Sequence, residues 1–333
     1  MNYYSFPVSI SCGGSRERRK DMFPICELFN IRYPLIQGGM GNISHAALTA
    51  AVSNAGGLGT LGCGTLSVDE VKSRIQETRI LTEQPFALNI AIRVSPYTEA
   101  LIDLAIAEKI PVVSLSAGNP APYIERLQVA GIKTIAVVAS VKQAVKAEQA
   151  GADVLVAEGV EAAGINSPLE LTTLTLIPQL VDRVNIPVLA AGGIGDGRGL
   201  AAVLLLGAAG AQLGTRLIAT EEAKVHSAYK AHLMDATDTD TRIIGRSVGF
   251  VRRVLDGPYV ERLTVETPAA FLDQTNESYH ITGALEGDEE NGYVNAGLVA
   301  GLIHDVPTVA ELFTRMMAEA EEQLKQTTTR FTT

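Results

Sequence analysis

The chain has 333 residues, of which 47% are apolar and 19% charged, and its formal net charge is −10. This apolar fraction is typical of a globular protein and too high for a disordered chain. The acidic balance argues against a nucleic-acid partner, and no apolar run reaches the roughly 18 residues that span a membrane. Only three cysteines occur and none forms a CxxC pair, which excludes a disulfide framework and a cysteine metal site. We therefore expect a cytoplasmic protein without a structural metal.

The first 21 residues differ in character from the rest of the chain. Residues 11–20 are small or strongly charged and show no apolar periodicity. The N-terminus also lacks the apolar core of roughly 7–15 residues that a secretory signal needs. We expect a flexible tail over residues 1–21, with ordered structure beginning at Met22 or Phe23.

From Pro34 onward one unit recurs: a short apolar run, a polar loop, an amphipathic segment and a glycine. Glycines at 56, 131, 151 and 207 directly follow predicted helices, where a residue with positive φ closes the last turn. The apolar runs show no alternation, which is typical of strands covered on both faces in a parallel sheet. Eight runs are expected as strands: 35–37, 58–61, 86–89, 112–115, 134–138, 154–157, 188–191 and 211–213.

Eight strands alternating with helices predict a (β/α)₈ TIM barrel over residues 22–220. A doubly wound open sheet is the rival, but the first turn reads QGGMGN and lacks the GxGxxG fingerprint of that fold. The pattern then weakens, and residues 221–295 are expected to form a smaller, mostly helical excursion that covers the barrel. Residues 296–333 are expected to return to the barrel and to end in a helix over about 306–325.

Two glycine-rich loops follow the seventh and eighth predicted strands, at residues 191–196 and 214–216. In a TIM barrel these loops commonly bind phosphate, because glycine lets the backbone approach the phosphate oxygens and a helix begins after the loop. The alternative is that the glycines only form tight turns.

The loop after the first strand places three glycines around Met40, which suits close backbone approach to a flat ring. Asn89, at the end of the third strand, offers donors and acceptors to a heterocycle. A plain turn at the first position and a loop cap at the second remain open.

Several motifs occur in a fixed order: PLIQGGMGNIS, AAVSNAGGLGTLG, PFALNIA, AEGVEAAG, IPVLAAGGIGDGRGLAAVLLLGAAGAQLGTRLIAT and AGLVAGLIHD. Over about residues 23–325 the chain resembles the nitronate monooxygenases, once called 2-nitropropane dioxygenases, and the related FMN-dependent enoyl-ACP reductases. The resemblance implies a barrel that holds FMN without a covalent bond. By motif position, the implied FMN-binding residues are Gly39, Met40, Gly41, Asn89, Ala91, Gly164, Gly193, Ile194, Gly195, Asp196, Gly214, Thr215 and Arg216.

Three positions depart from the family pattern. Ile165 stands where members with a catalytic histidine read EAGGH or ESGGH, Val137 stands where some members have a lysine, and Leu298 replaces the glutamine of the late AGQ motif. The catalytic residue is therefore unknown. Asn166 and His45 are weak candidates, since both lie near the expected flavin.

Three further polar residues have two readings each. Glu158 and Glu161 follow the sixth strand, where they either take part in acid–base chemistry or, the reading we favour, accept loop N–H groups. Arg216 either contacts the phosphate or is a buried ion-pair partner.

We expect an FMN-dependent oxidoreductase of the nitronate monooxygenase type, which oxidises alkyl nitronates with O₂. The alternative enzyme is an NAD(P)H-dependent reductase of enoyl thioesters or quinones. Whether NADH or NADPH is the electron donor stays open. A passive FMN-binding module is the non-enzymatic alternative. The IMP dehydrogenase and GMP reductase group needs a cysteine nucleophile after the sixth strand, and this chain has none there. The substrate is expected to be a small molecule, and the oligomeric state stays open, a homodimer included.

Overall fold

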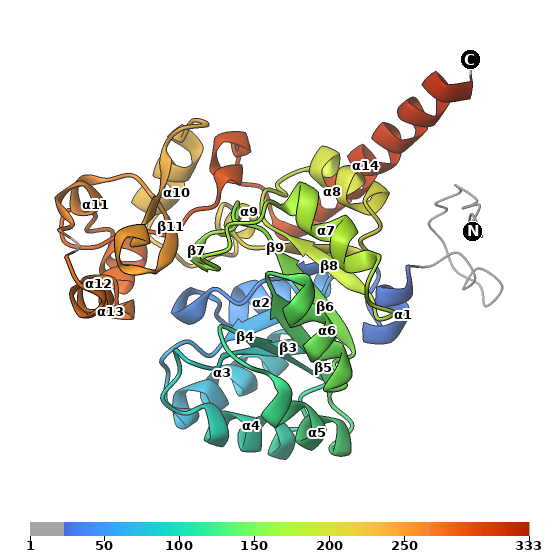
Figure 1. The fold of residues 1–333 in the computed structure, drawn as a ribbon, viewed down its shortest axis with the longest axis horizontal. Coiled ribbons are helices and arrows are strands. Elements are labelled where there is room, and N and C mark those ends of the chain that lie inside the picture. Colours follow the sequence, from blue (N-terminus) through green and yellow to red (C-terminus); the bar gives the residue numbers. More distant parts are fainter. Residues whose placement is uncertain (1–22, 265, 333) are drawn as a thin grey trace.

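The computed structural model describes residues 23–264 and 266–332, so the expected tail over residues 1–21 lies outside the described part. Eight parallel strands form one sheet in the order β1-β9-β8-β6-β5-β4-β3-β2. Its two edges meet where Leu58 N donates to Leu35 O (3.0 Å) and Gln37 N donates to Leu58 O (2.9 Å). The sheet is thus the predicted TIM barrel (Figure 1).

Every predicted apolar run is a strand of this barrel. The strands are β1 Leu35–Gln37, β2 Gly59–Gly62, β3 Phe86–Ala91, β4 Val112–Ser116, β5 Lys133–Val138, β6 Val154–Glu158, β8 Val188–Ala191 and β9 Gly210–Leu213. Side chains alternate between the helices outside and an aliphatic core along the axis, to which Val112, Val154 and Leu189 belong. Burial on both faces explains why these runs show no polar alternation.

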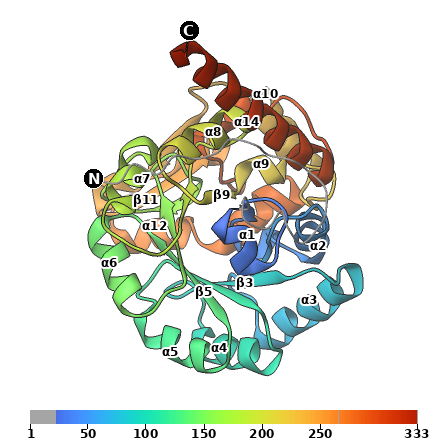
Figure 2. The same ribbon diagram turned by 90° about the vertical axis from the view of Figure 1, so that its right-hand side faces the viewer.

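Helices surround the strands, as Figure 2 shows along the barrel axis. They are α2 Ala46–Asn54, α3 Val68–Leu81, α4 Thr98–Ala107, α5 Ala121–Val129, α6 Val141–Gln149, α7 Thr173–Val181, α8 Gly197–Leu205 and α14 Val309–Thr332. The last helix packs against α8 and α2 and so fills the eighth position. It begins later and ends later than the expected 306–325. None of the described helices is both long and apolar enough to cross a membrane.

The four glycines predicted to end helices have the expected conformation. Their φ angles are 99° at Gly56, 76° at Gly131, 98° at Gly151 and 95° at Gly207. A side chain at such an angle is strained, so glycine closes these turns with the least strain.

The two ends of the barrel are covered differently. Helix α1 (Pro24–Phe29) lies at the amino ends of the strands, and its residues Ile25, Cys26 and Phe29 complete the core along the axis. The excursion lies at the opposite end, where the strands finish (Figure 1). This leaves the carboxyl ends of the strands facing a second layer of structure.

The excursion contains helices, as expected, and two strands that the sequence pattern did not predict. Its elements are α10 Ser227–Asp235, β10 Thr241–Ile244, η3 Arg246–Val248, β11 Val251–Leu255, α11 Pro258–Arg262, α12 Pro268–Gln274, α13 Glu277–Ile281 and the π-helical turn η4 Thr282–Glu286. Strands β10 and β11 form an antiparallel sheet with β7 (Gly164–Asn166), which belongs to the barrel loop after β6. The sequences TRII and VRRVL carry charges within the strand, which obscured their pattern.

Three further short elements link the layers: η2 Gly41–Ile43 after β1, α9 Thr215–Ile218 after β9, and η5 Leu298–Leu302 between the excursion and α14. The last of these contacts α9 and α10. The late AGLVAGLIHD motif thus joins the excursion to the loop after β9.

Candidate active site

Polar side chains gather at the carboxyl ends of the strands, whereas the barrel axis below them is aliphatic. By alternation with the axial core residues, Asn89, Ser114, Ser116, Glu158 and Gln212 face the mouth from β3, β4, β6 and β9. This is the end of a TIM barrel at which reacting groups are found. We refer to it as the mouth.

The loop after β1 approaches the end of β3 very closely. A Cβ atom on Gly39 would lie 2.1 Å from Asn89 Cγ, so only glycine fits there. The Asn89 amide nitrogen donates to Ser114 O (3.4 Å), Ser114 Oγ (3.3 Å) and Ser116 Oγ (3.2 Å). These bonds orient the Asn89 carbonyl oxygen beside Gly39. The structure thus brings together the two features that the sequence assigned to a heterocycle.

The remaining residues expected around a ring surround the same mouth. Gly41 has a φ of 55°, and Gly164, at the start of β7, has a φ of 72°. Ala91 ends β3, and its carbonyl oxygen accepts the N–H groups of the following turn. The half-buried Met40 packs against core clusters of both the barrel and the excursion.

The loop after β8 presents unpaired backbone donors. Gly192 and Gly193 have φ angles of 103° and 75°. Within the described residues, the N–H groups of Gly193, Ile194 and Gly195 donate to no protein acceptor. Successive free N–H groups in such a turn make a concave anion site.

There is room for an anion beside these donors. A Cβ atom on Gly193 would have no neighbour closer than 3.5 Å, and one on Gly214 would meet only Met40 Sδ, at 3.9 Å. Thr215 Oγ accepts the Gly297 N–H (3.0 Å), so the hydroxyl hydrogen of Thr215 is free to donate elsewhere. Glycines, free N–H groups and a hydroxyl together fit a phosphate group.

Two residues of the expected phosphate set, Asp196 and Arg216, have protein partners instead. Asp196 Oδ1 accepts from Arg198 N (3.0 Å) and Gly199 N (3.1 Å) and caps α8, and Gly197 N donates to Glu319. The start of α8 is therefore satisfied by carboxylates, contrary to the expectation that it would assist phosphate binding. Gly195 makes room for η5, since a Cβ there would lie 2.3 Å from the Val299 side chain.

Arg216 takes the second of its two expected roles. Its side chain is 2% exposed, and Nη2 donates to Asp305 Oδ1 (3.1 Å) and Ala219 O (3.1 Å). It is thus the partner of a carboxylate from the late AGLVAGLIHD motif.

The two glutamates after β6 have different surroundings. Glu161 accepts from Thr173 N (2.9 Å) and Thr173 Oγ1 (3.1 Å), which fixes the loop as expected. Glu158 has no hydrogen-bond partner among the described residues, and burial raises its pKa from 4.5 to about 7. In the barrel register Glu158 pairs with Ala191, and Ala191 with Gln212, whose side chain is likewise unbonded. The sequence reasoning missed Gln212, although its alternation with Ala211 and Leu213 places it inside the barrel.

The two weak candidates for catalysis, His45 and Asn166, both form hydrogen bonds within the protein. His45 Nε2 accepts the Lys224 N–H (2.9 Å), and burial, with help from Arg74 and Lys224, lowers the pKa of His45 to about 4. The Asn166 amide donates to Ala162 O (2.8 Å) and Gly164 O (3.2 Å). Ile165 lies between Gly164 and Asn166 on β7, and it is 47% exposed. The His45 Nε2 lone pair and the Asn166 amide are thus engaged in hydrogen bonds within the protein.

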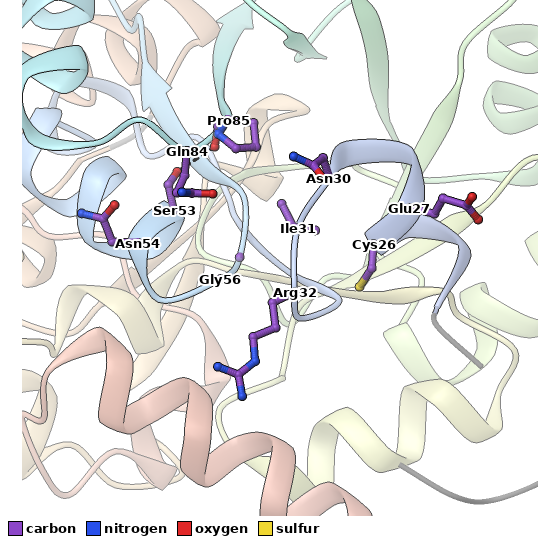
Figure 3. A pocket seen from close by; sticks show the side chains of 11 residues that line it. Cys26, Glu27, Asn30, Ile31, Arg32, Ser53, Asn54, Gly56, Gln84 and Pro85 are labelled. Atoms are coloured by element: carbon purple, nitrogen blue, oxygen red, sulfur yellow. Dashed lines mark hydrogen bonds between the residues drawn. The ribbon is translucent and has the colours of Figure 1, made fainter. Parts of the chain in front are cut away.

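A hollow of about 550 Å³ lies at the other end of the barrel, where Cys26, Arg32 and Asn54 line it (Figure 3). Burial raises the pKa of the Cys26 thiol to about 12, and likewise that of Cys63, so neither is a ready nucleophile. The described residues also contain no cluster of metal-ligating side chains. Among the described residues, the candidate active site is therefore the mouth.

A family model described as nitronate monooxygenase matches residues 23–100 and 90–319. The chain belongs to the nitronate monooxygenase family. A probable nitronate monooxygenase of Staphylococcus saprophyticus is 34% identical over 280 residues, which covers 71% of this chain and 79% of that one. FabK of Thermotoga maritima is similar in structure, with a TM-score of 0.89 and 38% identity over 92% of this chain and 98% of that one.

A third relative has a different name. A (3aS,4S,5R,7aS)-5-hydroxy-7a-methyl-1-oxo-octahydro-1H-indene-4-carboxyl-CoA dehydrogenase of Rhodococcus jostii is 31% identical, covering 90% of this chain and 96% of that one. Family membership makes this chain an oxidoreductase that uses a flavin and acts on a small molecule. It favours an enzyme over the passive module that the sequence left open.

Proposed function

We propose that the flavin is FMN. The loops after β8 and β9 provide one phosphate cradle, formed by the free N–H groups of Gly193, Ile194 and Gly195 with the Thr215 hydroxyl. The sequence has no fingerprint for an adenine nucleotide. Gly39, Met40 and the oriented carbonyl of Asn89 would hold the ring. When bound, the flavin supplies the hydride or electron chemistry, and these residues supply position and electrostatics.

We propose oxidation of alkyl nitronates with O₂ as the reaction. The observation that carries this choice is the apolar Ile165 at the position of the family histidine, on a strand beside the mouth. Neither His45 nor Asn166 offers a replacement base, because both are hydrogen-bonded within the protein. A nitronate is already deprotonated and needs no base, whereas a neutral nitroalkane does.

A second candidate is NAD(P)H-dependent reduction of an enoyl thioester or a quinone. One observation favours it: a relative that spans nearly the whole chain is named as a dehydrogenase of a CoA derivative. Such a substrate contains a thioester carbonyl, and its reduction also places negative charge on an oxygen. Both candidate reactions therefore require the site to stabilise a negatively charged oxygen.

Anaerobic mixing of the flavin-loaded enzyme separates these candidates. We expect propane-2-nitronate to bleach the flavin absorbance rapidly and 2-nitropropane to bleach it slowly. Rapid bleaching by NADH or NADPH, followed by reoxidation with crotonyl-CoA or a quinone, would support the second candidate instead. Chromatography of the cofactor released on denaturation tests the first proposal, and release of FAD would refute FMN.

A further inference from the structure

An arginine lies directly opposite Ile165, the residue that replaces the family histidine. Strands β7 and β11 are antiparallel, and Ile165 pairs with Arg252 in their register. Side chains of directly opposed residues project from the same face with Cβ atoms roughly 4.5–5.5 Å apart. Arg252 is therefore the nearest cross-strand neighbour of the position at which relatives carry the histidine.

The Arg252 side chain is held in place by an aromatic residue. Its Nη1 donates to Tyr293 Oη (2.7 Å), and its guanidinium carbon lies 5.3 Å from the centre of the Tyr293 ring. Tyr293 is 1% exposed and its hydroxyl donates in turn to Thr275 O (2.9 Å). This packing restricts the rotamers of Arg252, so the cation has a fixed position without a carboxylate.

The same aromatic group connects Arg252 with the mouth. His280 on α13 stacks on Tyr293 with ring centres 5.6 Å apart, and its Nδ1 lies 3.6 Å from Glu277 Oε1. That carboxylate oxygen accepts the Asn42 N–H (3.3 Å). Helix α13 thus sits against the loop after β1, which contributes Gly39 and Met40 to the mouth. A continuous set of contacts thus links the arginine, the aromatic group and this loop.

Among the described residues, Arg252 differs from Arg242 and Arg246 in lacking a carboxylate partner. Arg242 on β10 pairs with Asp256 and Arg246 pairs with Glu170. No carboxylate of the described residues lies within ion-pair distance of Arg252, and its buried Nε has no partner there. Glu277, whose charge reaches Arg252 through space, has Oε1 engaged with Asn42 and His280. A partly buried guanidinium with free donors is suited to a planar anion.

We propose that Arg252 binds the negatively charged oxygens of the substrate, taking over the charge-holding part of the role for which relatives use a histidine. Its free N–H groups donate to the two oxygens of a nitronate, or to the thioester carbonyl oxygen that becomes negative when hydride adds to an enoyl thioester. This rests on the proposed function, since it places the substrate at this mouth. Ile165 then forms the apolar wall beside that anion.

Binding of isobutyrate to the FMN-loaded enzyme tests this inference without turnover, because its carboxylate matches the planar NO₂ group of propane-2-nitronate. Bound isobutyrate is followed by the change that it produces in the flavin spectrum. We expect Arg252→Gln to weaken isobutyrate binding about 10- to 100-fold, since it removes charge-assisted hydrogen bonds. Arg252→Lys should recover part of this loss. Arg242→Gln is the matched control on the adjacent strand and should change binding by no more than about twofold.

A second variant guards against misfolding of Arg252→Gln. Tyr293→Phe keeps the charge and most of the packing but removes the hydrogen bond that positions the guanidinium, and it should weaken isobutyrate by about two- to tenfold. Isobutyrate affinity that is unchanged in Arg252→Gln, or reduced equally in Arg242→Gln, would overturn the inference.

The inference and the proposed function can fail separately. If the wild-type enzyme does not oxidise propane-2-nitronate but isobutyrate binding depends on Arg252, the nitronate function is wrong and the anion site stands. If Arg252→Gln oxidises the nitronate with wild-type kcat and KM, the function stands and the role of Arg252 is wrong.

Discussion

The mouth has two sides that are built in different ways. On the phosphate side, the loops after β8 and β9 act through backbone N–H groups and through the lack of side chains at Gly193 and Gly214. On the substrate side, the β7–β11 pair and α13 act through side chains, including Ile165 and Arg252. The first side therefore depends on backbone geometry, and the second on the identity of individual side chains.

This difference suggests where function diverges within the family. The proposed cofactor cradle includes Gly193, whose φ of 75° glycine adopts most easily, so geometry constrains this part of the motif. The substrate side depends on the identity of side chains at positions where the backbone conformation allows many residue types. Ile165 is accommodated on β7 and, unlike a histidine, cannot act as a base.

The largest effect is expected from restoring a base on the substrate side. Ile165→His should raise turnover of neutral 2-nitropropane by about 10²- to 10⁴-fold, the usual contribution of a general base. Turnover should then follow one ionisation near the ordinary histidine pKa of about 6.5. Ile165→Gln, which is polar without being a base, is the control. If both variants gain equally, polarity rather than proton transfer distinguishes the substrate side.

The phosphate side should respond to bulk instead of charge. Gly193→Val puts a side chain beside the free N–H groups, and we expect FMN affinity to fall at least about 100-fold, since several charge-assisted hydrogen bonds are lost. Gly131→Val is a matched control, because Gly131 has a φ of 76° against 75° at Gly193 and no atom within 4 Å of its Cβ position. Both variants carry the same backbone strain, and only the first should lose FMN on gel filtration. Equal loss in both would mean that the strain, not the cradle, governs binding.

The sequence predicted the two sides unequally well. The strands, the turn glycines and the cradle glycines are local patterns, and the structure has them at the expected positions. Arg252 was not predicted, because its neighbours Ile165 and Tyr293 are far away in the sequence. They reach it only in the folded structure, through β7–β11 pairing and a side-chain hydrogen bond. The role of Arg216 depended in the same way on a distant residue, Asp305.

An intermediate effect is expected at Glu158, which lies between the two sides of the mouth. Its folded pKa of about 7 exceeds the ordinary value of 4.5, so ionisation opposes folding increasingly as the pH rises through this interval. The full penalty, up to about 3 kcal/mol, applies above pH 7. Relative to wild type, Glu158→Gln should therefore gain unfolding free energy between pH 5 and pH 8, as measured by urea denaturation. Glu83→Gln, which alters an exposed glutamate at the opposite end of the barrel, should show no such gain.

The smallest effect on catalysis is expected at His45, although it is the histidine that the sequence placed nearest the flavin. Its Nε2 lone pair accepts the Lys224 N–H, and a neutral ring whose lone pair is engaged cannot take a proton from the substrate. Glutamine can accept the same bond, so His45→Gln should leave turnover at pH 7.5 within about twofold of wild type.

The pH dependence of stability gives His45→Gln a second readout. Because the pKa of His45 falls from 6.5 to about 4 on folding, the unfolded chain takes up a proton first. Wild type should therefore lose up to about 3 kcal/mol of stability as the pH falls through that interval. The variant should lose less over the same range in urea denaturation. Loss of turnover, together with the disappearance of an ionisation near pH 6.5, would instead make His45 a catalytic base.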